Sequence, residues 1–459
     1  VYMQDAQGLI VSYKDFYIPK GGKLFIYNDD KSQVLGAYTH NTNPDGGQFS
    51  TDIIYGNKLV FEYVASETDN EQPRIVVNDV GYIYSKNLNA SPSSSDTCMV
   101  NINCAEGDDW QRQKRGVVHL MMRFSDGWYV CSGSLVNNSN NDGTPYVLTA
   151  NHCFYDEEAY PVDSANFATA RFYFNYEYPS CVNGAGTEMP ASTRSLVGAT
   201  QKVRLPLSNK SDGLLVELKD SVPPEWHPYY NGWDATNDSV TSGVVIHHPD
   251  GDVKKISTFT RQLLSTEWWT TTYGENTKFW EVRYARTASG HLSVTAGGSS
   301  GSPVFNQNGL IVGTLTGGES YCKNQSGGGP NSPDWFGKMW YHYDQSLIAD
   351  QKMKTYLAPN SEVTFLQGYD PNGGSNIRVA RKDVRMAFFP NPVTDELNVN
   401  VGEIIAHIRI ADAFGHLTYE ASRLKSSTTA VPVSAWPSGV YLVTVKTEQG
   451  TFTGKVIKN

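Results

Sequence analysis

The chain has 459 residues, of which 39% are hydrophobic and 18% are charged, and its formal net charge at pH 7 is −10. This length exceeds what one hydrophobic core normally serves, so we expect about three domains. The acidic balance argues against a nucleic-acid partner, because phosphate binding needs a basic protein surface.

Residues 1–88 predict a small antiparallel β-sandwich. Apolar or alternating runs at residues 8–11, 23–27 and 59–63 are separated by turn signals such as Gly21-Gly22. The segment at residues 87–97 is rich in Ser, Asn and Pro, which is typical of a linker or a processing site. The N-terminal unit is therefore also a candidate pro-region.

The cysteines all lie in the central part of the chain. Their number is even and they form no Cys-x-x-Cys pair, which predicts three disulfides in an oxidising compartment rather than buried thiols. The spacing alone leaves fifteen connectivities open. The six residues are Cys98, Cys104, Cys131, Cys153, Cys181 and Cys322.

Residues 98–366 hold two motifs that each present one reactive side chain. The apolar run at residues 147–150 predicts a strand that ends next to His152. Ser300 lies in the sequence Gly-Ser-Ser-Gly-Ser-Pro at residues 298–303, ahead of further strand-like runs. A serine hydroxyl becomes a good nucleophile when a positioned histidine removes its proton. Either motif alone suggests a structural histidine or a flexible turn, whereas the two together predict nucleophilic catalysis.

A third catalytic residue, an acid, would orient the histidine. The order His, acid, Ser is that of chymotrypsin-like enzymes, so the acid should lie between His152 and Ser300. Asp212 leads directly into an apolar strand and is the first candidate. Other acids in the same interval remain as rivals, namely Asp163, Asp220 and Asp234. The backbone N–H groups of Gly298 and Ser300 are the candidate oxyanion donors.

The end of the chain predicts two further features. An amphipathic stretch near residues 345–357 predicts a helix that closes the central domain. After a linker at residues 368–382, residues 386–459 contain alternating runs at 397–401, 408–410 and 441–445, which predict an Ig-like β-sandwich. The chain has no run of about 18 apolar residues, so it predicts no transmembrane segment.

Residues 98–366 resemble bacterial lysyl endopeptidases, which are trypsin-like serine proteases of the chymotrypsin fold. The resemblance implies an all-β protein with a double β-barrel protease domain between two β-sandwiches. It also implies that Asp212 is the triad acid and that the disulfides are Cys98–Cys322, Cys104–Cys181 and Cys131–Cys153. The matching segments are residues 131–138, 148–153, 212–215, 232–234, 246–249, 298–303 and 317–318.

A buried carboxylate is needed to bind a cationic substrate side chain. In animal trypsins this acid lies six residues before the nucleophile, where this chain has Val294. The resemblance instead implies Asp334, with Glu319 as the second candidate. It further places Thr316, Gly317 and Gly318 at the substrate and implies a nearby tryptophan, Trp268 or Trp269. Because the family has a histidine where Thr316 stands, we expect cleavage after Lys, and after Arg in addition.

Activation should differ from that of trypsin. The residue before the nucleophile is Ser299, which has no charge to pair with a new N-terminus. We therefore expect the N-terminal unit to be removed or displaced, with Lys86 or Ser93 to Ser95 as the candidate cut site.

Residues from about 388 onward resemble the sorting domain of the bacterial type IX secretion system. Residues 389–393, 439–443 and 455–458 carry this resemblance. It implies an enzyme that is secreted or attached to the cell surface, with the secretion machinery and protein or peptide substrates as its partners. The sequence predicts no cofactor and no metal site. The alternatives are an inactive protease-fold adhesin and, for the C-terminal unit, a carbohydrate- or matrix-binding sandwich.

Overall fold

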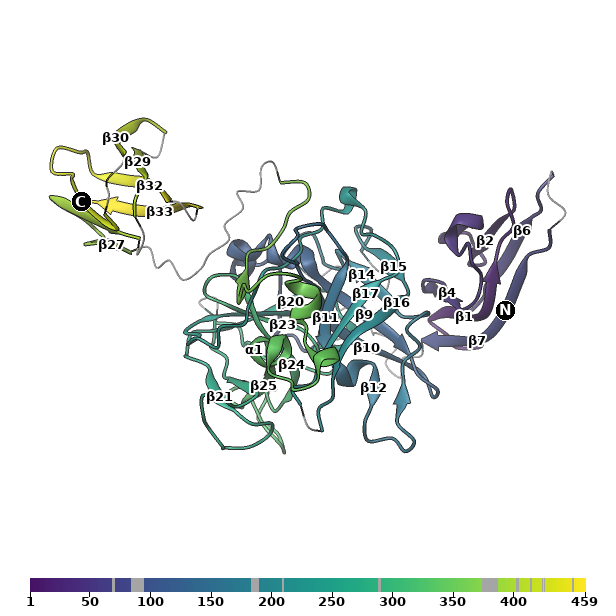
Figure 1. Ribbon diagram of the computed structural model, residues 1–459. Helices are drawn as coiled ribbons and strands as arrows, with labels where there is room; N and C mark the ends of the chain where they lie inside the picture. Colours follow the sequence, from purple (N-terminus) through teal and green to yellow (C-terminus); the bar gives the residue numbers. More distant parts are fainter. Residues whose placement is uncertain are drawn as a thin grey trace. The chain divides into compact units, whose positions relative to one another are not determined.

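The computed structural model describes residues 1–67, 71–83, 95–182, 190–208, 210–287, 290–373, 387–401, 404–412, 415–422, 424, 426–447 and 450–459. These form two compact units, Val1–Asn372 and Gly373–Asn459 (Figure 1). The expected boundary between residues 88 and 98, inside the first unit, stays a prediction. Lys86, Ser93 and most of the 87–97 segment lie outside the described residues.

The N-terminal part of the first unit is a β-sandwich, as expected. One sheet has the order β4-β1-β5 with β7 also paired to β1, and the other has the order β3-β2-β6. Residues such as Leu9, Phe16 and Leu24 fill the core between the sheets. The strand β2 alternates buried and more exposed positions, whereas β1 is buried along most of its length. The strands are β1 (Gly8–Tyr17), β2 (Lys23–Tyr27), β3 (Val34–Tyr38), β4 (Phe49–Ser50), β5 (Ile54–Tyr55), β6 (Val60–Val64) and β7 (Arg74–Ile83).

A seven-stranded sheet of order β15-β14-β9-β10-β11-β17-β16 follows in the chain. Apolar side chains including Leu120, Val147 and Leu214 are buried inside it. A short hairpin of β12 (Tyr155–Asp156) and β13 (Asp163–Ser164) projects from it. The main strands are β9 (Val117–Arg123), β10 (Trp128–Leu135), β11 (Tyr146–Ala150), β14 (Arg171–Phe174), β15 (Arg194–Val197), β16 (Ala199–Leu205) and β17 (Gly213–Leu218).

A ten-stranded sheet forms the rest of the first unit, with the main order β21-β22-β25-β24-β23-β19-β20-β8. A shared core, with Leu148 and Leu215 on one side and Ile246 and Phe305 on the other, joins the two sheets. Together they form the chymotrypsin-like double β-barrel, which confirms the expected all-β fold. The strands are β8 (Val100–Asn101), β18 (Trp233–Asp234), β19 (Gly243–His247), β20 (Lys255–Phe259), β21 (Leu264–Thr266), β22 (Phe279–Val282), β23 (Pro303–Asn306), β24 (Ile311–Gly318), β25 (Asp334–Lys338) and β26 (Phe365–Leu366).

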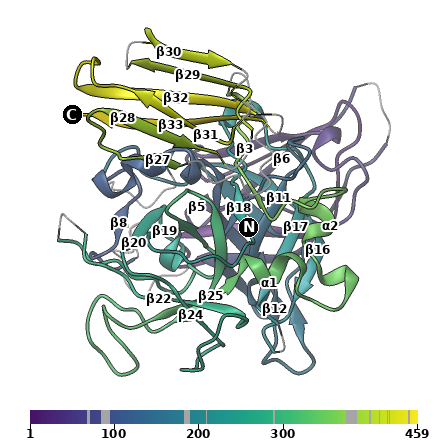
Figure 2. The same cartoon turned by 60° about the vertical axis from the view of Figure 1, so that its left-hand side comes forward.

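Helices are short. The helix α1 (Met339–Asp344) packs against β24 and β25 (Figures 1 and 2), and α2 spans only Lys354–Leu357. The expected single helix across residues 345–357 is therefore wrong. The Ser346 hydroxyl accepts a hydrogen bond from the Ile348 N–H, a local bond that competes with helix continuation. The 3₁₀ helices are η1 (His40–Thr42), η2 (Ala105–Trp110), η3 (Gln113–Gly116), η4 (Asn151–Cys153), η5 (Pro224–Trp226), η6 (Pro249–Gly251) and η7 (Ala349–Gln351).

The second unit is a β-sandwich of a three-stranded sheet, β27-β28-β31, and a four-stranded sheet, β30-β29-β32-β33 (Figure 2). Its core includes Leu397, Ile408, Val443 and Val445, at the alternating positions that the sequence predicts. None of the helices in the described part of the chain has the length and apolar character to cross a membrane. The strands are β27 (Ala387–Phe389), β28 (Glu396–Asn400), β29 (His407–Asp412), β30 (Leu417–Ser422), β31 (Thr428–Pro432), β32 (Gly439–Thr447) and β33 (Gly450–Lys458).

Candidate active site

His152 and Asp212 meet because two neighbouring strands end together. Antiparallel pairing of β11 with β17 places Ala150 opposite Gly213. Beyond this pair, the His152 backbone N–H donates to Oδ1 of Asp212 at 2.9 Å, and Nδ1 of the same imidazole lies 2.7 Å from Oδ2. Both carboxylate oxygens therefore hold one histidine, which fixes the orientation of its ring.

Asp212 is fully buried and its backbone has a φ of +59°, a left-handed conformation that aspartate adopts more readily than most residues. Behind it, Oγ of Ser211 lies 2.8 Å from Nδ1 of His342, whose Nε2 lies 3.0 Å from Oγ1 of Thr314. This buried support was missed in the sequence, since nothing in its local pattern marks His342. A Cβ on Gly213 would lie 2.4 Å from His342 Nδ1, so only glycine fits between them.

The pKa of His152 reflects two opposing effects. Burial lowers it, but the negative charge and the hydrogen bond of Asp212 outweigh burial, so the pKa lies above its ordinary value of 6.5. The charge of Glu157 acts in the same direction. The site therefore stabilises an imidazolium, the form that a general base takes after it accepts a proton.

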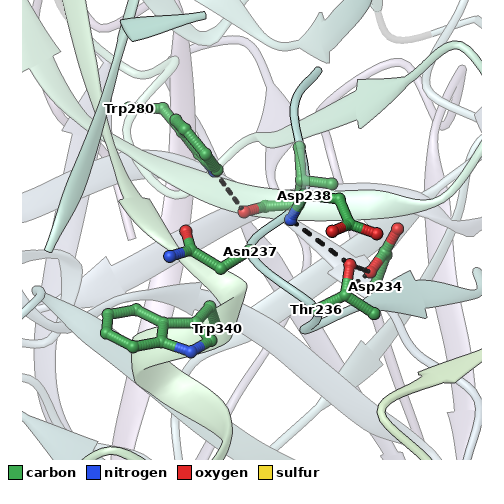
Figure 3. Close-up of a pocket in the computed structure, with 7 residues that line it drawn as sticks. Asp234, Thr236, Asn237, Asp238, Trp280 and Trp340 are labelled. Atoms are coloured by element: carbon green, nitrogen blue, oxygen red, sulfur yellow. Dashed lines mark hydrogen bonds between the residues drawn. The ribbon is translucent and has the colours of Figure 1, made fainter. Parts of the chain in front are cut away.

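The rival acids do not occupy this position. Asp163 lies on the exposed β12–β13 hairpin, where it accepts hydrogen bonds from Ser125. Asp220 is exposed. Asp234 lines a separate small hollow, where it accepts the hydroxyl of Thr236 at 2.7 Å (Figure 3). The same hollow is lined by Asn237, Asp238, Trp280, Val312 and Trp340.

Ser300 lines the same cleft as His152, a cavity of about 860 Å³ that Thr316 and Trp268 also border. A Cβ on the next residue, Gly301, would lie 2.1 Å from Oγ1 of Thr149, so only glycine allows the loop to approach the strand before His152. In the described part of the chain, the Ser300 hydroxyl forms no hydrogen bond with His152. The loop thus places Ser300 in the cleft that His152 also lines.

Ser132 clamps the serine loop from the neighbouring barrel, a role that sequence reasoning missed. Its backbone N–H donates to the Ser300 carbonyl at 2.8 Å, and its hydroxyl donates to the Gly298 carbonyl at 2.9 Å. The same hydroxyl accepts the backbone N–H of His248 at 2.9 Å. Two carbonyls of the loop are therefore held away from the cleft.

The loop amides divide into two kinds. The N–H groups of Ser299 and Gly301 are used internally, with bonds to Ala296 and Leu315 of 3.0 and 2.7 Å. Within the described residues, the N–H groups of Gly298 and Ser300 have no internal acceptor. Both residues are only partly buried, and their amides remain the candidate oxyanion donors.

Asp334 is fully buried at the start of β25, opposite Gly318 in the neighbouring strand β24. It accepts hydrogen bonds from the Thr295 hydroxyl at 2.7 Å and from the Ser320 hydroxyl and amide at 2.7 and 3.1 Å. Burial raises the pKa of its carboxyl group, and these hydrogen bonds only partly offset the rise. No lysine or arginine of the described residues forms an ion pair with Asp334. Glu319, its rival, is only partly buried.

The other expected substrate residues lie in or beside β24, the strand that pairs with the start of β25. The Thr316 hydroxyl is buried and has no partner among the described residues. Gly317 follows it, and a Cβ there would lie 3.4 Å from Cη2 of Trp268. Trp268 therefore borders the cleft, whereas Trp269 is 51% exposed and stacks on Trp335.

Three disulfides link Cys98 to Cys322, Cys104 to Cys181, and Cys131 to Cys153, the same pairs that the resemblance implies. The last bridge joins β10 to η4, which contains His152. It therefore braces the histidine against the strand that carries Ser132.

Comparison with known proteins gives two family matches. Residues 93–337 match the family model of the lysyl endopeptidase C-terminal domain, and residues 387–459 match that of the secretion system C-terminal sorting domain. The lysyl endopeptidase of Pseudomonas aeruginosa is 30% identical over 326 residues, which cover 67% of this chain and 63% of that enzyme. The match thus spans less than two thirds of the relative's length.

Solved structures of proteases are more remote. The thermostable serine protease AL20 from an extremophilic microorganism is 14% identical, with 49% of this chain and 91% of that chain covered and a TM-score of 0.33. A Glu endopeptidase in complex with MPD is 15% identical, with 49% and 85% covered and a TM-score of 0.31. Both are too distant to bear on what this chain cleaves.

Proposed function

Since this chain belongs to the lysyl endopeptidase family, we propose that it is a secreted serine endopeptidase that cleaves proteins on the C-terminal side of lysine. The observation that carries the proposal is the pairing of the buried Asp212 with His152, whose partly exposed side chain lines a cleft shared with Ser300. This arrangement supports a nucleophile, a base and an orienting acid in the order expected for the family.

The reaction proceeds in two halves. Ser300 Oγ attacks the scissile carbonyl while Nε2 of His152 takes its proton, and the N–H groups of Gly298 and Ser300 bind the resulting oxyanion. The intermediate then collapses, His152 protonates the leaving amine, and the peptide's acyl group stays on Ser300. Water, deprotonated by His152, then attacks this ester, the bond between the acyl carbon and Ser300 Oγ breaks, and His152 returns the proton to Ser300 Oγ as the carboxylic acid leaves. Asp212 remains ionised throughout and stabilises the imidazolium.

Selection of lysine rests on Asp334. A buried carboxylate without a cationic partner is costly to the free enzyme, and a substrate ammonium would neutralise it. The three hydrogen bonds from Thr295 and Ser320 hold this carboxylate in place. With Thr316 in place of the family's histidine, arginine is accepted as a second and slower substrate.

The C-terminal unit directs the protein out of the cell. Residues 387–459 are a secretion system sorting domain, and the protein is secreted or attached to the cell surface. We assign the type IX machinery as its export partner. Removal of residues 387–459 should leave active protease inside the cell, and normal export of the shortened chain would favour a matrix-binding role for this unit.

The catalytic proposal is tested by labelling the purified full chain with a fluorophosphonate probe. Ser300→Ala should abolish labelling, while Ser302→Ala, which removes a buried hydroxyl without a partner, should retain it. Digestion of a denatured protein followed by mass spectrometry should then give cuts after lysine and fewer after arginine. Cuts after acidic or large apolar residues would contradict the role of Asp334. Absence of labelling would instead favour an inactive protease-fold binding protein.

A further inference from the structure

Ser299 lies between the two residues that offer their amides to the cleft, yet its own side chain points away into the protein. It is fully buried, and so is the side chain of its partner His247, the last residue of β19. Oγ of Ser299 lies 2.7 Å from Nδ1 of His247. The sequence marked Ser299 only as an uncharged replacement for the trypsin aspartate, without indicating what it contacts.

The hydrogen bonds around this pair form a continuous chain with one consistent direction. Ser299 Oγ accepts the N–H of Ala296 at 3.2 Å, so its own hydrogen is available for Nδ1 of His247. Nε2 of His247 then carries the ring proton and donates to Ser257 Oγ at 3.2 Å. The Ser257 hydroxyl donates to the carbonyl of Val294 at 2.8 Å. Each polar atom is satisfied, as buried networks require.

This chain is electrically neutral. Burial and, to a smaller extent, the charge of Lys255 lower the pKa of His247 to about 3, so the ring stays uncharged at working pH. A neutral ring accepts the Ser299 proton at Nδ1, whereas a protonated ring would donate there and break the direction of the chain.

The anchored Ser299 lies in the backbone between the two proposed oxyanion donors. The Ser300 N–H belongs to the peptide group that joins it to Ser299, so its direction depends on the backbone torsions of Ser299. The Gly298 N–H lies two peptide groups earlier, in a residue with a φ of +83°. A Ser299 side chain held at Oγ, together with its N–H bond to Ala296, restricts rotation of the two peptide groups that flank Ser299, one of which carries the Ser300 N–H and the other of which follows Gly298.

We propose that Ser299 and His247 are positioning residues that hold the oxyanion site permanently assembled, independent of any newly formed N-terminus. This inference rests on the proposed serine endopeptidase function. The charged pair that a trypsin-type zymogen forms on activation is replaced by neutral hydrogen bonds within the barrel. Any control by the N-terminal unit would then act by blocking the cleft rather than by leaving the oxyanion loop unformed.

The test compares full-chain variants in hydrolysis of a lysyl peptide amide. Ser299→Ala and His247→Leu should lower kcat by about 10- to 100-fold with KM changed less than about twofold, because oxyanion donors act in the transition state. His247→Asn retains an acceptor where Nδ1 lies and should recover most of the loss. His119→Phe is the control, since His119 is an equally buried histidine whose Nδ1 has no partner in the described structure.

A second measurement separates positioning from general damage. A peptidyl-lysinal inhibitor forms a tetrahedral adduct with an oxygen in the oxyanion site, so its Ki should rise by the same factor as kcat falls. The Ki of n-butylamine, which occupies only the lysine pocket, should stay unchanged. Equal activity of Ser299→Ala and the unmutated chain, or parallel weakening of both inhibitors, would overturn the inference. Ser299→Ala removes a single oxygen atom, so it keeps the test decisive if His247→Leu fails to fold. Failure of the unmutated chain to cleave the peptide would overturn the proposed function itself.

Discussion

Gly318 leaves no room for a side chain beside Asp334. A Cβ at position 318 would lie 1.8 Å from Oδ1 of the buried carboxylate and 2.6 Å from its Cα. The two residues are directly opposed in the β24–β25 pairing, so the strand cannot move away without losing its ladder. A side chain at position 318 would therefore displace the carboxylate of Asp334, the residue that we propose binds the lysine ammonium.

Gly318→Ala should therefore reduce kcat/KM for a lysyl peptide by about 100-fold or more, since a misplaced charge partner loses several kcal/mol of binding energy. Gly274→Ala is the control in the same sheet region, because a Cβ there would meet only Thr277 at an ordinary contact distance of 3.7 Å. Steady-state kinetics of both variants on one substrate make the comparison. Similar losses of kcat/KM in the two variants would show that the loss in Gly318→Ala does not arise from displacement of the Asp334 carboxylate.

Asp334→Asn should nearly abolish cleavage after lysine, with a fall in kcat/KM of about 10³-fold, because the substrate ammonium would be buried without a counter-charge. The effect of the same substitution on thermal stability should be opposite to its effect on activity. Burial raises the pKa of Asp334, so in the absence of substrate the ionised carboxylate costs stability at neutral pH. The variant should unfold at the same or a higher temperature. A large loss of stability would mean that the carboxylate serves the fold rather than the substrate.

The pH dependence of catalysis should follow His152. The base must be neutral to accept a proton, and Asp212 raises its pKa above 6.5, so activity should fall as the pH drops through a value higher than 6.5. Asp212→Asn removes the raising charge. It should cut kcat by about 10⁴-fold and move the acid limb of the remaining activity to lower pH. An unchanged acid limb in a pH–rate profile of this variant would assign that limb to another group.

The Cys131–Cys153 disulfide closes a loop with a sequence separation of 22 residues. Loop-closure entropy for this size predicts a stabilisation of about 3 kcal/mol. The double variant Cys131→Ala, Cys153→Ala should lose about that free energy of unfolding in a urea titration. Its kcat should also fall, since η4 and His152 lose their link to β10. Retained kcat would show that the β11–β17 pairing alone holds the histidine.

Much of this site was predictable from local sequence. His152 and Ser300 lie in short motifs that follow or precede buried strands, and such motifs keep their meaning wherever the fold places them. The choice among four aspartates was not local. Asp212 is selected by the register of β11 against β17, which brings Ala150 opposite Gly213. Only the family resemblance supplied that long-range information.

The supporting residues were beyond local reasoning for the same reason. His247 and His342 are single histidines in apolar surroundings, and each gains its role from a partner more than 50 residues away, Ser299 for one and Ser211 for the other. The contact between the N-terminal sandwich and the first barrel was also not foreseen. Buried polar pairs of this kind form only in the assembled fold, so the periodicity of the sequence does not predict them.

That contact centres on Arg171, a buried residue of β14. Its Nε lies 2.8 Å from Oδ1 of Asp52, and another guanidinium nitrogen donates to the Ser50 carbonyl at 2.7 Å. Ser50 in return donates its hydroxyl to the Thr169 carbonyl at 2.8 Å. The sandwich therefore supplies the counter-charge for a barrel arginine.

Asp52→Ala should consequently lower the free energy of unfolding by about 2–3 kcal/mol. Breaking a fully buried pair costs about 3–5 kcal/mol, and the smaller value is expected here because Asp52 is 31% exposed. Asp29→Ala provides the control. It breaks the pair with Lys58 on the surface of the same sandwich, where the side chains are 70% and 45% exposed, and should cost less than about 1 kcal/mol. Urea titrations of both full-length variants make the measurement. Equal changes in the free energy of unfolding would indicate that the contact with Arg171 adds no stability to the protein. This result would favour the sandwich as a removable pro-region. A clearly larger effect of Asp52→Ala would make the sandwich a structural part of the protease, since its Asp52 would then stabilise the barrel through Arg171.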